Sequence, residues 1–250
     1  MKKRFSKILL SKILLLVTIF LFSLNIFAKN KTPLLYVGTE AEFAPFEYLE
    51  NGKVVGFDMD LIDEIAKIIG YDIKVETMKF DGLLPALQAK KLDIVIAGVT
   101  VTDERKKFVD FSDTYYVSEQ MIVVNKTVDT GIKSFKDFPG KDVGVVLGYT
   151  ADLVVSEIEG VNIKRYNGTG EAIMALKAKK LDAIVIDSEP AKNYSAQNDD
   201  LTVIESDSAK EEYAIVLRKG QDEILKKIND ALKTLKENGK YDELIKKYFK

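Results

Sequence analysis

Arg105 and Asp187 are the charged residues whose types and positions best suit the binding of a small ionic molecule. Arg105 falls in the first turn of a predicted helix that Thr102 would cap, where a cation opposes the helix dipole. Its planar guanidinium could hold a carboxylate through two hydrogen bonds, although a surface arginine neutralised by Asp103 and Glu104 is the alternative. Asp187 ends an apolar run, where a buried carboxylate needs a partner unless it caps the helix that follows.

The composition restricts the chemistry that such a site can do. The chain has 250 residues, a net charge of −2, and neither His nor Cys. This excludes Ser-His-Asp and Cys-His catalysis, disulfides, and zinc sites with His or Cys ligands. Charges of both signs are scattered and no long basic run follows the N-terminus, so we expect no nucleic-acid partner. We also expect no metal and no cofactor.

Aromatic residues near predicted strand ends could enclose the apolar part of a ligand. Phe43 lies in the loop "EAEFAPFEY" and Phe80 at the predicted end of a strand, with core packing as the alternative for both. Core packing is the interpretation for Phe46 and Phe57. Glu40, taken by itself, is interpreted as a solvated loop acid.

Two stretches of the chain almost repeat each other, "ALQAKKLDIVIAG" at 86–98 and "ALKAKKLDAIVID" at 175–187. Each ends a strand-helix-strand-helix-strand order, which predicts two α/β lobes with mainly parallel sheets. The alternative is a favoured helix-to-strand connector used twice. Ligands bind beyond the carboxyl ends of parallel strands, where Gly98 and Asp187 hold equivalent places. Gly98 would then let a ligand approach the backbone closely, and Asp187 would offer it a negative charge.

The lobes are predicted to be joined by two crossings of the chain. Apolar strands at Met121–Val124 and Ala214–Leu217 stand at these crossings, which would form a hinge. The last segment predicts two amphipathic helices, separated at Asn238-Gly239, that return to the first lobe. Lobe 1 is therefore expected to comprise 34–120 and 214–250, and lobe 2 to comprise 121–213.

Residues 1–28 predict a signal peptide, with a basic start, an apolar run and Ala28 at the cleavage position. An uncleaved membrane anchor is the alternative. No Cys follows the run, so lipid attachment through cysteine is excluded. We expect a free protein in an envelope compartment, the periplasm.

Three segments together resemble a known family: "GTEAEFAPFEY", "GFDMDLIDEIAKIIG" and "GVTVTDERKKFVDFSDTYY". They are similar to the polar amino-acid-binding proteins of bacterial ABC importers, the group of glutamine, histidine and lysine/arginine/ornithine binders. The resemblance extends from about Leu34 to the C-terminus. It implies a two-lobed Venus-flytrap fold of the type II periplasmic-binding class with two hinge strands. It also implies a monomer that delivers a polar L-amino acid to an ABC permease in the inner membrane.

The same resemblance assigns residues to the two charged groups of an amino acid. Arg105 would hold the α-carboxylate, helped by Thr100 and by the backbone N–H groups at Thr150. Asp187 and the carbonyl of Gly98 would hold the α-ammonium. These roles agree with what a zwitterion needs from opposite lobes.

The ligand's side chain would lie between Phe43 and Phe80 and meet Glu40 at its polar end. Arginine or lysine is the preferred ligand, because a charged side chain compensates a buried carboxylate better than an amide does. Glutamine or another polar amino acid is the alternative. Tyr149 departs from the small Ser or Thr that relatives usually carry there, which puts the lobe-two contact at this position in doubt.

An enzyme on the same scaffold is the alternative of another class. Cyclohexadienyl dehydratases resemble descendants of such binders and would need a general acid in the cleft, for which Glu40 is available. The amino-acid motif around Arg105 and Asp187 favours binding without catalysis.

Overall fold

The computed structural model describes residues 32–249, apart from the side chain of Asp207. The predicted signal peptide therefore lies outside the described residues. The chain from Leu34 onward forms one unit. Within residues 32–249, no helix has the length and apolar character needed to cross a membrane.

The first sheet contains strands from both ends of the described chain. Its order is β5 (Asp72–Thr77), β1 (Leu34–Thr39), β6 (Ile94–Val95), β13 (Val216–Arg218) and β7 (Val109–Phe111). The first three strands are parallel, and β13 runs antiparallel to both of its neighbours. Buried Val and Ile side chains on β1 and β6 explain why these strands lie at the centre.

The second sheet repeats this plan. Its order is β10 (Asn162–Tyr166), β9 (Asp142–Val146), β11 (Ala183–Asp187), β8 (Tyr116–Asn125) and β12 (Leu201–Tyr213). Again three parallel strands are followed by an antiparallel one, and β8 pairs with both β11 and β12. The chain passes between the sheets from β7 to β8 and from β12 to β13.

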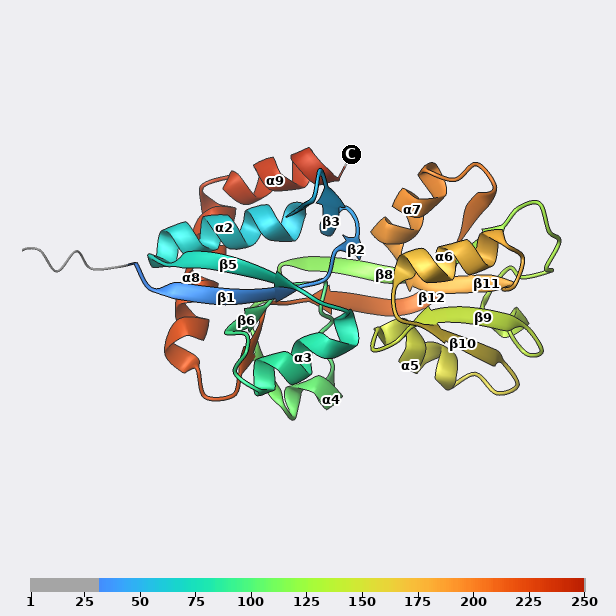
Figure 1. Ribbon diagram of the computed structural model, residues 1–250, viewed down its shortest axis with the longest axis horizontal. Coiled ribbons are helices and arrows are strands. Elements are labelled where there is room, and N and C mark those ends of the chain that lie inside the picture. Colours follow the sequence, from blue (N-terminus) through green and yellow to red (C-terminus); the bar gives the residue numbers. More distant parts are fainter. Residues whose placement is uncertain (1–31, 250) are drawn as a thin grey trace, which may run out of the picture. The chain divides into compact units, whose positions relative to one another are not determined.

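Helices cover both faces of each sheet. Figure 1 shows α2 (Phe57–Ile69) and α3 (Phe80–Gln88) on opposite sides of the first sheet. In the same view α5 (Thr150–Ser156) and α6 (Thr169–Lys177) lie on opposite sides of the second. The remaining short elements are β2 (Glu42–Phe43), β3 (Glu47–Glu50), β4 (Lys53–Val55), α4 (Asp103–Lys106), η1 (Phe135–Asp137) and α7 (Ser188–Ala196).

The sequence repeat corresponds to repeated geometry. Lys90 and Lys179 both leave their helices with φ of 59°. Leu92 covers Gly38 of β1, and Leu181 covers Gly144 of β9; a Cβ on either glycine would lie within 2.6 Å of the leucine. The repeat therefore reflects two halves of similar construction rather than a connector used twice.

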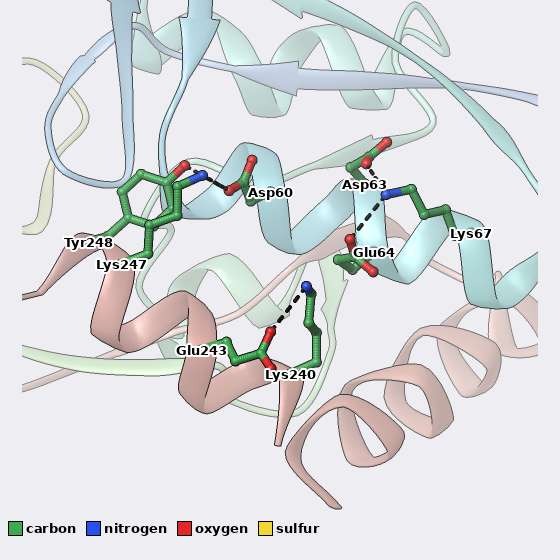
Figure 2. Close-up of polar contacts among 8 residues, drawn as sticks. All are labelled: Asp60, Asp63, Glu64, Lys67, Lys240, Glu243, Lys247 and Tyr248. Carbon is green, nitrogen blue, oxygen red and sulfur yellow. Dashed lines mark hydrogen bonds and ion pairs between the residues drawn. The ribbon is translucent and has the colours of Figure 1, made fainter. Parts of the chain in front are cut away.

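The C-terminal helices α8 (Asp222–Glu237) and α9 (Lys240–Tyr248) pack against α2, which covers the first sheet. Figure 2 shows α9 attached to α2 at Asp60, whose Oδ2 lies 2.7 Å from Lys247 Nζ and 2.8 Å from the Tyr248 hydroxyl. Phe249 then stacks on Tyr116 of β8, with ring centroids 4.8 Å apart. The residue limits of the two lobes stay a prediction, because the contacts from Leu34 onward define one unit.

Three local predictions differ from the structure. Phe80 begins α3 and does not end a strand, because β5 stops at Thr77. The segment "DGLLPALQAKK" predicts a helix with Pro85 in its first turn, but Pro85 is the sixth residue of α3; the helix loses only one internal hydrogen bond there. The near-continuous apolar run "LDIVIAGVT" predicts a buried strand, but the observed strand is only β6, because Gly98 has a left-handed φ of 55° that turns the chain.

Candidate functional site

Seven of the eight residues selected from the sequence line one small cavity where the carboxyl ends of β6, β9 and β11 meet. Its lining is Phe43, Phe80, Ala97, Gly98, Thr100, Arg105, Tyr149, Thr150 and Asp187. The space open to the centre of a water molecule is only about 10 Å³, which is room for about one water. Glu40, the eighth residue, lies behind Tyr149.

Arg105 is half-buried and points into the cavity. Its Nη1 donates to the carbonyl of Thr100 at 2.7 Å, and its Nη2 donates to the carbonyl of Gly148 at 2.9 Å. The Cζ atom lies 5.5 Å from the centroid of the Phe80 ring. Thr102 caps the short helix as predicted, accepting from the backbone N–H of Arg105 at 3.2 Å.

The acids next to Arg105 do not neutralise it. Asp103 and Glu104 are exposed and pair instead with Lys106 and Lys107. The alternative of a surface arginine neutralised by these acids is therefore wrong. The guanidinium instead donates to the backbone carbonyls of Thr100 and Gly148 at the cavity.

Asp187 is 3% exposed at the end of β11. Its Oδ1 accepts from Gln120 Nε2 at 2.6 Å, and its Oδ2 accepts from the Tyr213 hydroxyl. The residue occupies the N-cap position of α7, as the capping alternative predicted, but its side chain makes no capping hydrogen bond there. Burial, and to a smaller extent nearby Glu211, raise the pKa of Asp187 to about 7, against the lowering effects of Tyr213, Gln120 and Arg105.

A buried polar network around Asp187 was missed by the sequence analysis. Thr150 Oγ1 donates to Glu211 Oε2 at 3.0 Å, and Gln120 Nε2 lies 3.1 Å from both Thr150 Oγ1 and Glu211 Oε1. Gln120 and Glu211 come from the paired strands β8 and β12, so the strands that join the sheets hold the lining residues Thr150 and Asp187 from behind. Glu211 adds a second buried carboxylate close to Asp187 and Arg105.

Glu40 is 1% exposed, so the interpretation of a solvated loop acid is wrong. Its Oε2 accepts from the Tyr149 hydroxyl at 2.7 Å, and its Oε1 has no hydrogen-bond partner within the described part of the chain. Burial raises the pKa of Glu40 to about 7, against the lowering effect of the Tyr149 hydrogen bond. A cation would be the natural partner for the free oxygen.

A second pair of buried acids lies directly behind Gly98. The Gly98 N–H lies 3.1 Å from Asp58 Oδ2, and the Tyr115 hydroxyl donates to the same oxygen at 2.8 Å. Glu47 is fully buried next to Asp58, and neither of its carboxyl oxygens has a partner among the described residues. Burial raises the pKa of Asp58 to about 6 and that of Glu47 well above its usual range. These residues fix the Gly98 backbone at the cavity.

We expect the protein without added small molecules to lose stability as the pH rises from about 4 to 7. The pKa values of Glu40, Asp58 and Asp187 are raised on folding. In that window the unfolded chain has already released protons that the folded chain still binds, so the free energy of unfolding falls with pH and then levels. Each pKa unit corresponds to about 1.4 kcal/mol.

Thermal melting at pH 5 and pH 8 checks this expectation. The midpoint at pH 8 should be lower by about 5 °C or more, since a chain of this size shifts by roughly 2–4 °C per kcal/mol. The matched variant Glu40→Gln should reduce the difference between the two midpoints. A midpoint that is equal or higher at pH 8 would contradict the pKa shifts.

A contact outside the cavity also joins the two halves. Glu42 of β2 forms an ion pair with Lys79, and its Oε2 accepts from the backbone N–H of Gly170 at 3.2 Å, in the first turn of α6. The Tyr194 hydroxyl on α7 donates to the Glu42 carbonyl at 3.1 Å. Gly168 permits this approach, because a Cβ there would lie 2.4 Å from Glu42 Oε2. Glu42 thus supplies the first turn of α6 with an anion from the other half.

The geometry suits a small zwitterion better than a metal ion. Arg105 presents a cation from one half, Asp187 presents an anion from the other, and Glu40 lies outside the lining, bonded to Tyr149. Within residues 32–249, no group of acidic side chains is arranged to hold a metal ion.

The comparisons agree with this geometry. A family model described as bacterial extracellular solute-binding proteins, family 3, matches residues 35–250. The arginine-binding extracellular protein ArtP of Bacillus subtilis is 40% identical over 220 residues, 86% of each chain.

Two solved structures of an arginine-binding protein are also similar to this chain over most of its length. An ancestral arginine-binding protein bound to arginine is 46% identical, with a TM-score of 0.84 over 87% of this chain and 98% of that one. The structure of an ancestral arginine-binding protein bound to glutamine has the same identity and TM-score over 88% of this chain and 99% of that one.

Proposed function

Because the chain belongs to family 3 of the bacterial extracellular solute-binding proteins, we propose that it captures an L-amino acid, preferably arginine, in the cavity between its two sheets. The observation that carries this proposal is the placement of Arg105 and Asp187 on opposite sides of one cavity. An α-carboxylate and an α-ammonium need one such partner each, at the same time.

Each charged group of the ligand has a defined set of partners in this proposal. Nη2 of Arg105 receives the α-carboxylate, with Thr100 and Thr150 beside it. Asp187 and the Gly98 carbonyl receive the α-ammonium. Closing the two halves removes water from these contacts and strengthens each of them.

The charges in and next to the cavity favour a cationic side chain. Glu40, Asp187 and Glu211 are all buried, Arg105 lies near Asp187 and Glu211, and Lys79 lies near Glu40. Arginine and lysine bring two positive charges and one negative charge, so either offsets this excess of acid, whereas glutamine brings none. Arginine is preferred because its fork of donors matches a carboxylate, here that of Glu40, which is reached past Phe43 and Phe80.

Calorimetric titration of Glu40→Gln tests the ligand choice. We expect the variant to bind L-arginine about tenfold more weakly, since a buried cation would lose its anionic partner, and to bind L-glutamine no more weakly than the wild type. The control Glu50→Gln changes an exposed acid on β3 and should leave both affinities unchanged. An unchanged arginine affinity in Glu40→Gln would contradict the role of Glu40.

Glutamine is the second candidate ligand, because an ancestral relative was solved with glutamine bound. Catalysis is an alternative of another class, since the pKa of Glu40 near 7 would suit a general acid. We propose binding without turnover. Incubation with prephenate and a search for its dehydration product separates the two functions.

Delivery completes the proposed function. The protein would act as a monomer in the periplasm and pass its amino acid to an ABC permease in the inner membrane. Family membership supports an extracellular place for the chain.

Glu42 is expected to contribute to affinity although it does not line the cavity. Glu42→Ala removes the anion at the start of α6 and the pair with Lys79, so the closed arrangement becomes less favourable. Arginine affinity should fall by roughly threefold to tenfold, because a ligand binds less well when its binding-competent state is less populated. The control Glu50→Ala should have no effect, and equal affinities in the two variants would contradict this contribution.

A further inference from the structure

Tyr149 lies in contact with every residue that we assign to the ligand's side chain. Its ring meets Phe80 edge to face with centroids 4.7 Å apart and meets Phe43 in the same way at 5.4 Å. Its hydroxyl donates to Glu40 Oε2 at 2.7 Å. The phenol is therefore a flat group between Phe43 and Phe80 that ends in a donor to Glu40.

Gly148, the residue before Tyr149, contacts the Arg105 guanidinium, which we assign to the ligand's carboxylate. The carbonyl of Gly148 accepts from Nη2 of Arg105 at 2.9 Å. Gly148 has a left-handed φ of 86°, and a Cβ there would lie 3.3 Å from the backbone of Asp81. This glycine allows the loop of the second half to enter the first half and to present an acceptor oxygen and a phenol together.

We infer that Tyr149 and the carbonyl of Gly148 occupy the places of the ligand's side chain and carboxylate, so that Tyr149 sets affinity and specificity as an internal competitor. The inference rests on the proposed function for the identity of the ligand. The argument is geometric: one dipeptide contacts Arg105, Phe43, Phe80 and Glu40, and the remaining space holds about one water. An arginine side chain and the phenol cannot both lie between the two phenylalanine rings.

Displacement of the phenol has a chemical consequence for selectivity. A long side chain must replace two aromatic contacts and one hydrogen bond before it gains anything. A guanidinium does so, because it adds a charge opposite Glu40, whereas an amide only replaces one neutral donor by another. Displacing Tyr149 thus has a free-energy cost that the contacts of a cationic ligand exceed and those of a neutral ligand do not.

The test compares wild type, Tyr149→Phe and Tyr149→Thr by calorimetric titration with L-arginine and L-glutamine. We expect Tyr149→Thr to bind arginine roughly tenfold more tightly and to bind glutamine measurably, because no phenol has to be displaced. Tyr149→Phe keeps the ring but loses the bond to Glu40, so its affinities should fall between the other two. Tyr166→Phe, on β10 outside the cavity, should match the wild type. Equal or weaker arginine binding in Tyr149→Thr would overturn the inference.

Small-angle X-ray scattering without amino acid provides a second, ligand-independent readout. The radius of gyration of Tyr149→Thr should exceed that of wild type and decrease when arginine is added, because the internal competitor also holds the halves together. An unchanged radius in Tyr149→Thr would overturn the inference. If no protein in the series binds any amino acid, the proposed function fails, and the scattering comparison still decides whether Tyr149 closes the cavity.

Discussion

Arg105→Ala is expected to weaken the binding of L-arginine by about a hundredfold or more. The ligand's carboxylate would be buried between the two halves without its cation, and removing one partner of a buried, hydrogen-bonded charge pair costs about 2–5 kcal/mol. The neighbours cannot substitute, because Lys106 and Lys107 are exposed and pair with Asp103 and Glu104. Calorimetric titration of the purified variant measures the loss.

Two further variants show whether the guanidinium itself is responsible. Arg105→Lys restores the charge but not the planar fork, so it should recover only part of the affinity. Arg165→Ala is the matched control, because Arg165 is exposed and pairs within the second half, at 2.9 Å, with Asp152. Its arginine affinity should equal that of wild type. An affinity within threefold of wild type in Arg105→Ala would contradict the role of Arg105.

Asp187→Asn should have opposite effects on binding and on stability. Arginine affinity is expected to fall by about a hundredfold, since the buried α-ammonium loses its anion. The melting temperature without amino acid at pH 8 is expected to rise by several degrees, because a carboxyl group whose pKa is raised to about 7 destabilises the folded state above that pH. A residue that serves only to stabilise the fold would not give this combination.

Asp182→Asn is the control for this variant. Asp182 immediately precedes the same strand and accepts from the backbone N–H of Asp142 at 2.8 Å, outside the cavity. The control should keep its arginine affinity and lose stability through the weakened hydrogen bond. If Asp187→Asn binds arginine as well as wild type does, Asp187 is not the ammonium partner.

The repeat made most of the fold predictable. Similar stretches at 86–98 and 175–187 place a helix end, a left-handed lysine and a buried strand in the same order in both halves. Strand β12 could not be predicted, because its polar segment "ESDSAKEEY" has no alternation and is ordered by pairing with β8. The segment "EAEFAPFEY", predicted as a loop, likewise contains β2 and the beginning of β3.

The residues that line the cavity were largely predictable because strand ends of parallel sheets converge. Their surroundings were not. The burial of Glu40 depends on Tyr149 from the other half, 109 positions away. Glu211 and Gln120 lie on strands whose side-chain directions follow from the antiparallel pairing, which no local pattern in the sequence specifies. The only sequence signal for Tyr149 at the cavity was its departure from the small Ser or Thr of the family pattern.

Titration of residues 29–250 with L-arginine and L-glutamine at pH 7.5 tests the central claim most directly. The proposed function predicts one arginine per chain, bound at least about tenfold more tightly than glutamine, with binding lost in Arg105→Ala. Tighter binding of glutamine would contradict arginine as the preferred ligand. Binding of neither by wild type or Tyr149→Thr would contradict the proposed capture of arginine or glutamine in this cavity.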